Sequence, residues 1–291
     1  MFRKLIPIVL IFLISLFLNT SYSQDRIVYL KGSMKFNYFV DIDQQTFSYV
    51  TNNKWRVDSI TNFKFWFFNF KGLSTSSIVK YDSSLDSTEE IQVDHGAKEY
   101  TKKVHKGNVT MELWNKFQIG GDSQKNQNKT GNEQNKDNLK QNTPTTDPQV
   151  SVNYKPSVAV INSNNVDATE LEISYKTNNQ SFKVLIKLIN SKDLKKFFDD
   201  KTLKEIAKYL NKYKINLTGE MSAVGNIPQN IDKEIKKILD PVLKQGRDLI
   251  YDLKLLTNNK PIIEAVFFNE IKVLPYKSDY FEIPQGYSEK K

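Results

Sequence analysis

From Arg247 to Val273 the chain reads RDLIYDLKLLTNNKPIIEAVFFNEIKV, two alternating runs that flank a pair of asparagines. The first run has the period of a half-buried strand, with apolar Leu249, Tyr251, Leu253 and Leu255 on one side and Asp252 and Lys254 on the other. Asn258 and Asn259 tolerate positive φ, which a two-residue hairpin turn requires. The return run alternates in the same way, with Ile263, Ala265, Phe267, Ile271 and Val273 opposed to Glu264, Glu270 and Lys272. This stretch therefore predicts a long antiparallel β-hairpin, which we expect Pro284 and Gly286 to end.

The first hundred residues after the N-terminal segment predict further strands of the same kind. Short β-prone runs are separated by Asp, Asn, Gly and Ser, at 27–30, 34–42, 47–50, 55–57, 63–70, 78–81, 91–93 and 109–117. Because no helical periodicity interrupts this series, we expect a meandering antiparallel sheet.

The run from Phe63 to Phe70 is unusual because both of its faces are aromatic. A strand that is apolar on both sides is either covered twice or lines a cavity. One interpretation is a central strand packed against helices on one face and against a loop on the other. The other is that one face lines a groove for an apolar ligand.

The composition changes abruptly at Gly120. From there to Asp147 almost every residue is polar or Gly, and Leu139 is the one sizeable apolar residue. Such a segment cannot bury enough surface to offset the entropy of ordering it. We therefore expect a disordered insert at 120–155 within one domain, whose two parts are 24–119 and 156–291.

The second part predicts strands followed by helices. Strand patterns return at 157–161, 170–176 and 182–189. Thr202 and Glu205 suit the capping box of a first helix, and a second helix is expected from Pro228 to Gly246, with a kink before Pro241. Residues 214–225 fit either a further strand or a mobile flap.

The N-terminal residues predict export. Basic Arg3 and Lys4 precede an apolar stretch from Leu5 to Leu18, and Ser21 and Ser23 give the small-x-small pattern of signal-peptidase sites. We expect a signal peptide at 1–23 and a periplasmic or secreted mature chain. The absence of cysteine excludes disulfides and a lipid-modified N-terminal Cys.

The long hairpin followed by Phe281-Glu282-Ile283-Pro284-Gln285-Gly286-Tyr287 resembles the ending of the DUF4412 family of exported bacterial proteins. That family is similar in fold to the LolA and LolB lipoprotein carriers. The resemblance implies an α+β fold: a curved antiparallel β-sheet, a half-open LolA-like barrel, packed against two or three helices and interrupted by the disordered insert. It implies no catalytic residues.

The residue types argue against most chemistries. His95 and His105 have no partner at metal-ligand spacing, and no nucleophile elbow, phosphate loop or dinucleotide fingerprint occurs. The net charge of +9 is spread along the chain and forms no basic stripe with aromatics. We therefore expect neither an enzyme nor a nucleic-acid-binding protein, and no cofactor or metal; transient contact with an anionic membrane surface stays open.

The carrier resemblance implies a binding function. We expect an apolar ligand, a lipid or a lipoprotein acyl chain, between the sheet and the helices, lined by Phe65, Trp66, Phe67, Phe68, Leu239 and Leu243. Since a fold does not establish a function, the alternative is a protein–protein interaction module of the envelope with a filled core and no ligand.

Overall fold

The structure is a computed structural model, and it describes residues 26–37, 40–66, 68–117, 149–176, 181–204, 237–239, 241 and 248–290. Twelve strands form one sheet in the order β12-β6-β5-β4-β3-β2-β1-β11-β10-β9-β8-β7. In chain order they are β1 (Arg26–Asn37), β2 (Asp41–Val50), β3 (Lys54–Phe65), β4 (Phe68–Asp82), β5 (Ser87–Asp94), β6 (Glu99–Lys106), β7 (Gln149–Ile161), β8 (Asn164–Lys176), β9 (Ser181–Asn190), β10 (Asp248–Thr257), β11 (Lys260–Pro275) and β12 (Ser288–Glu289).

The expected α+β class is wrong, because the described chain is mainly β. The sheet is open, with β12 and β7 at its two edges, and all neighbours are antiparallel except β12 and β6. Among the described residues, helical structure is limited to α2 (Thr110–Phe117), the 3-10 turns η2 (Asp193–Lys196) and η4 (Ser278–Phe281), and short pieces at 200–204, 237–239 and 241. The helices of the described residues are too short to form a layer of their own, and polar, Lys-rich segments such as β6 pair in the sheet and add to its strands.

The hairpin of β10 and β11 is confirmed, with Asn258 and Asn259 at φ 50° and 63° in its turn. Its alternation is not strict, because the β9–β10 register shifts at Tyr251. As a result Leu253 and Leu255 pack in one apolar cluster, whereas Leu249 and Tyr251 pack in another. The expected half-buried strand is therefore buried on both sides.

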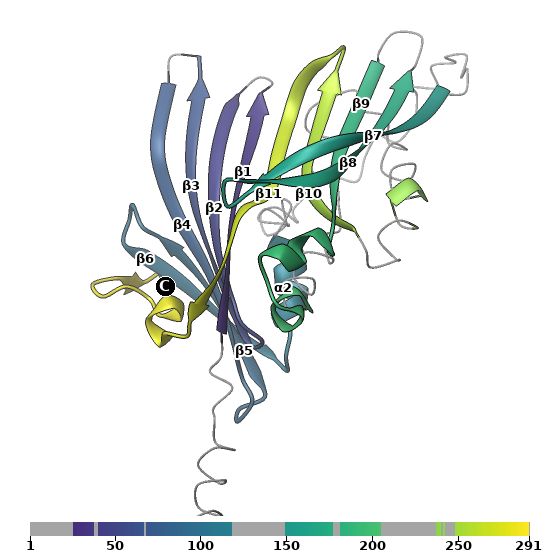
Figure 1. The fold of residues 1–291 in the computed structure, drawn as a ribbon. Coiled ribbons are helices and arrows are strands. Elements are labelled where there is room, and N and C mark those ends of the chain that lie inside the picture. Colours follow the sequence, from purple (N-terminus) through teal and green to yellow (C-terminus); the bar gives the residue numbers. More distant parts are fainter. Residues whose placement is uncertain are drawn as a thin grey trace, which may run out of the picture.

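The sheet bends where β1 meets β11. Between Lys31 and Ser33 the register shifts, so that Gly32 faces several residues of β11. A bulge of this kind bends the strand and increases its local twist. Figure 1 shows the long strands fanning out from a narrow base, with the hairpin β7–β8 lying across the region of β10 and β11. Contacts of Asn162 with Ile271 and of Tyr251 with Val160 fix that crossing.

The segment 109–117, expected as a strand, is the helix α2. The side chain of Asn108 accepts a hydrogen bond from the Thr110 N–H, which caps the first turn. Trp114 is completely buried and meets the ring of Trp55 edge-on, with centroids 5.4 Å apart. The Trp55 indole N–H donates to the Thr110 carbonyl at 2.8 Å, so α2 is fastened to β3.

The C-terminal segment does not simply end the sheet after Pro284 and Gly286. Residues 276–290 cross the strands β1 to β6 on the face opposite α2, and Phe281 is buried among Ile27, Ile78 and Ile91. The segment then adds β12 in parallel to β6, at Glu99 and Tyr100.

The first expected helix begins earlier than its predicted cap. Residues 200–204 are helical, and the Asp199 carboxylate accepts the Thr202 N–H at 2.7 Å, so Asp199 caps the helix in place of Thr202. That hydrogen bond lowers the pKa of Asp199 below its usual value. Glu205, residues 214–225 and most of the second expected helix lie outside the described residues. The expected insert overlaps β7 at 149–155, and 120–148 lie outside the described residues.

Candidate functional site

The register of the sheet lines up apolar side chains across nine strands. Residues directly opposite one another on paired strands share a face of the sheet. One line of such residues is apolar on each of the nine strands that follow one another in the sheet as β4-β3-β2-β1-β11-β10-β9-β8-β7. We call it the apolar row; its members are Phe70, Phe63, Ile42, Phe36, Ile263, Leu255, Val184, Ile173 and Val152.

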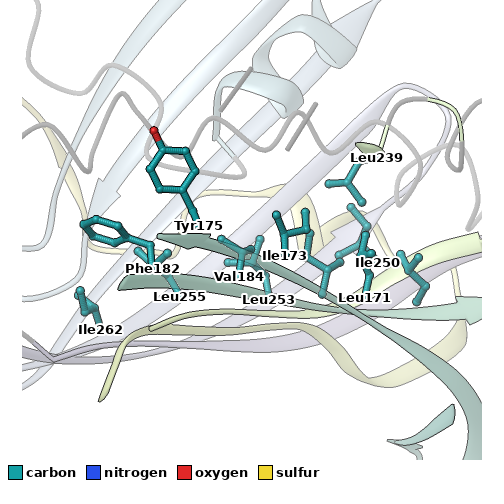
Figure 2. Packing of buried hydrophobic residues seen from close by; sticks show 12 residues of the cluster. Leu171, Ile173, Tyr175, Phe182, Val184, Leu239, Ile250, Leu253, Leu255 and Ile262 are labelled. Carbon is teal, nitrogen blue, oxygen red and sulfur yellow. The ribbon is translucent and has the colours of Figure 1, made fainter. Parts of the chain in front are cut away.

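One half of the apolar row is buried. On β10, β9 and β8, Leu255, Val184 and Ile173 are almost inaccessible and belong to a large cluster with Leu171 and Ile250. Figure 2 shows Leu239 lying above these strands, with the side chains of Leu171, Ile173 and Ile250 directed towards it. Leu239 is thus a cover for this half of the row.

The other half is incompletely covered. Phe36, Ile42, Phe63 and Ile263 are only partly buried, and Phe70, at the end of the row, is 56% exposed. This half lies on the same face of the sheet as α2. Side chains two residues apart along a strand point to the same face, and Phe63 follows Trp55, which contacts α2, by an even number of residues in a β2–β3 pairing without a register shift. The incompletely covered half of the row therefore lies on the face that α2 packs against, and it crosses β3 eight residues beyond Trp55.

The aromatic run at 63–70 is a hairpin tip rather than one strand. β3 ends at Phe65, β4 begins at Phe68, and these two residues pair. Phe63, Phe65, Phe68 and Phe70 consequently share one face, and the rings of Phe68 and Phe70 stack with centroids 6.3 Å apart. The alternation of aromatics along the run had suggested two aromatic faces, but the turn at Trp66 returns all four phenylalanines to the face of the apolar row.

The turn itself uses an unusual residue. Trp66 has φ 50° and is 79% exposed. Bulky side chains rarely adopt positive φ, and the turns between β7 and β8 and between β10 and β11 use Asn162, Ser163, Asn258 and Asn259 in that conformation. An exposed Trp in a strained turn is an indication of function.

The expected lining residues therefore fall in two places. Phe65, Trp66 and Phe68 lie at the exposed hairpin tip, while Leu239 lies over the buried half of the row. None of these three aromatics shares a core cluster with Leu239 among the described residues. Phe67 and Leu243 lie outside the described residues. The row residues that link the two places, such as Phe36 and Ile263, were missed, because their alignment depends on strand pairing.

A polar network on the opposite face resembles a Ser–His pair. His95 Nε2 lies 2.6 Å from Ser76 Oγ, and Ser76 is 1% exposed. Ser76 donates its single hydroxyl proton to Asp58, which also accepts from Arg56 Nε at 2.6 Å. Ser76 Oγ must then accept the proton of His95 Nε2, which leaves Nδ1 to accept from the Tyr287 hydroxyl at 2.8 Å.

This proton arrangement is the reverse of what a nucleophile needs. A general base accepts the serine proton, whereas here His95 donates to a buried Ser76. Arg56 also donates to the carbonyl of Tyr280, so the network joins the C-terminal segment to β3 and β4. Its role in this geometry is to hold that segment on the sheet, and the contact could not be expected from the sequence because Tyr287 lies 192 residues from His95 along the chain.

The remaining groups show no metal chemistry within the described part of the chain. His105 pairs with Glu90 at 2.8 Å, and no group of three or more His, Asp or Glu side chains is positioned to hold a metal among the residues described. Within the same residues no helix has the length and apolar character to cross a membrane.

Comparisons with protein-family models, curated proteins and solved structures find no match, so the resemblance to the DUF4412 family remains a prediction.

Proposed function

We propose that this chain is an exported, non-enzymatic binding protein of the bacterial envelope that holds an apolar ligand on the incompletely covered half of the apolar row. The ligand class is a lipid or the acyl chain of a lipoprotein. The observation that carries the proposal is the continuity of the row, which runs from the Leu239-covered cluster to Phe70 without a polar residue.

The length of the incompletely covered half fits such a ligand. It crosses the five neighbouring strands β4, β3, β2, β1 and β11. With a strand spacing of about 4.8 Å, the distance from the first strand to the last is roughly 19 Å. That length is comparable with the roughly 15 Å of hydrocarbon in one leaflet of a bilayer. Each methylene buried there contributes about 0.8 kcal/mol, so a long chain is favoured over a short one.

Trp66 supplies a direct probe of binding. Trp55 and Trp114 are buried and Trp66 is exposed, so a ligand that reaches the hairpin tip changes the emission of Trp66 in particular. Titration with fatty acids of increasing length should shift the emission to shorter wavelength, with stronger binding for longer chains. Trp66→Phe should bind the same fatty acids without that shift.

The decisive experiment is native mass spectrometry, with solvent extraction, on protein purified from an exporting host. The wild-type chain should carry a lipid mass. Phe70→Asp, which places a charge at the end of the row, should lose it. Ile60→Asp is the matched control, because Ile60 is exposed on the other face of the same hairpin and should keep the ligand. Trp66→Ala should weaken uptake without unfolding the protein.

A bare polypeptide mass for the wild-type chain, together with cooperative melting, would contradict the proposal. It would favour the alternative function, an envelope interaction module that binds another protein without a ligand. One observation supports that alternative: β7 is an edge strand whose outer side is not fully paired among the described residues.

A further inference from the structure

The outer edge of β7 presents its backbone groups in a fixed alternation. The Val160 N–H and C=O both bond the Tyr251 hydroxyl, so they point away from β8. The β7–β8 register is continuous from Gln149 to Ile161, and outward groups recur at every second residue of an antiparallel strand. The backbone N–H and C=O groups that point outward are therefore those of Val150, Val152, Tyr154, Val158 and Val160, with the carbonyl of Pro156.

The C-terminal half of this edge is already closed. Tyr251 occupies the groups of Val160, and the Lys187 ammonium donates to the Val158 carbonyl at 3.0 Å. Pro156 has no N–H to offer, and a proline in this orientation costs the β8 ladder nothing. No further strand can pair along this half.

The N-terminal half is open among the described residues. No described residue bonds the outward groups of Val150, Val152 or Tyr154, and their side chains are exposed. The edge at the other end of the sheet differs, because β12 covers part of β6 and the rest carries Lys102, Lys103 and Lys106. Lysines discourage edge pairing, whereas the open half of β7 carries only Lys155, which pairs with Glu170 at 2.8 Å.

We propose that this half of β7 pairs with the same strand of a second copy of the chain. In an antiparallel pair centred on Val152, the twofold axis sets Val152 against Val152 and Val150 against Tyr154. The other face sets Ser151 against Asn153 and Gln149 against Lys155, so no like charges meet. In each copy the backbone N–H groups of Val150, Val152 and Tyr154 then donate to the partner strand and their C=O groups accept from it, which gives roughly six backbone hydrogen bonds.

Neighbouring registers are poorer. A pair centred on Tyr154 sets Val152 against Pro156, which cannot donate, and one centred on Val150 sets Tyr154 beyond the start of β7. The strand is thus self-complementary in one register. Because Val152 ends the apolar row, this pairing also joins the rows of the two copies into one.

The test is the oligomeric state of the exported protein, measured by sedimentation over about 1–500 μM, a range that detects micromolar dissociation constants. The wild-type chain should dimerise. Val152→Lys and Val152→Glu each place like charges face to face across the twofold axis and should weaken the dimer at least about tenfold. An equimolar mixture of the two variants should restore a one-to-one heterodimer, because opposite charges then meet.

Val104→Lys is the control, since Val104 is an exposed valine on the part of β6 that β12 leaves unpaired and its replacement should leave the dimer intact. A monomeric wild-type chain at every concentration would overturn the proposal. If the monomer also protects the amides of Val150, Val152 and Tyr154 from hydrogen exchange, the chain itself covers the edge. A dimer that survives Val152→Lys, or variants that fail to recombine, would equally overturn it. These outcomes are independent of lipid binding, which the extraction experiment reports separately.

Discussion

Gly32 permits the close approach of β1 and β11 at the bend, and its replacement by alanine tests that reasoning. A Cβ at this position would stand 2.7 Å from the Phe267 carbonyl oxygen and 2.8 Å from that of Val266, with Thr46 Oγ1 at 3.0 Å. Ordinary contact begins at 3.4 Å, so each carbonyl would have to retreat by roughly 0.6–0.7 Å, and overpacking of this kind costs about 1–3 kcal/mol. Because the obstacles are backbone atoms of paired strands, we expect the upper part of that range.

The unfolded state offsets part of the loss. Alanine restricts the unfolded chain relative to glycine and returns about 0.4–1 kcal/mol, so Gly32→Ala should lower the free energy of unfolding by about 2 kcal/mol. Urea unfolding should show a lower midpoint with an unchanged slope. Gly96→Ala is the matched control, since its nearest obstacle is a side-chain oxygen of Asp94 at 3.3 Å, which has to give way by only about 0.1 Å. Equal losses in both variants, or a loss below about 0.5 kcal/mol for Gly32→Ala, would refute the argument.

Two further predictions concern the coverings of the sheet. Trp114→Ala should lower the free energy of unfolding by about 3–5 kcal/mol, because it empties the site between α2 and Trp55; a loss below about 1 kcal/mol in urea unfolding would show that α2 does not stabilise the sheet. Burial raises the pKa of the Asp252 carboxyl, and Lys187 at 3.4 Å opposes this shift only in part. The contribution of Asp252 to the free energy of unfolding is therefore fully present below the ordinary pKa of about 3.9, and it is lost as pH rises through the raised pKa of the folded state. The free energy of unfolding of the wild-type chain minus that of Asp252→Asn should therefore fall as pH rises above about 4, and a difference that stays flat or rises would contradict the assignment.

The sequence predicted those elements whose conformation depends on the preferences of neighbouring residues. The β10–β11 hairpin follows from its alternation and its two asparagines, both of which are at positive φ in the structure. The β3–β4 turn gave no such signal, because Trp66 occupies a position where Asn or Gly is usual. Helix α2 was missed although Asn108 is a good cap, since Val109 and Trp114 also suit a strand and tertiary packing on Trp55 decides between the two.

Long-range pairing could not be read from the sequence. The crossing of residues 276–290 to β6 depends on Arg56, Ser76 and His95, which lie far from Tyr287 along the chain. The apolar row likewise requires the register of eight strand pairs, so residues such as Phe36 and Ile263 carry no mark of their role. The expected ligand residues at 65–68 were chosen for their aromatic character, and the structure places those described at one end of that row.

A sheet that is apolar on both faces must be covered on both, and the coverings here explain where a ligand is expected. On the face opposite α2, the C-terminal segment covers β1 to β6 through Phe281. On the other face, α2 covers β3 and β4 around Trp55 through Trp114, and Leu239 covers β8 to β10. Among the described residues no comparable anchor lies over the row from Phe70 to Ile263. Water on five partly exposed apolar side chains is unfavourable, and the sheet is open, with β12 and β7 at its edges, so its own strands do not close over this gap. If an acyl chain fills the gap, it acts as the missing cover, and its binding should raise the stability of the protein by an amount that grows with ligand concentration.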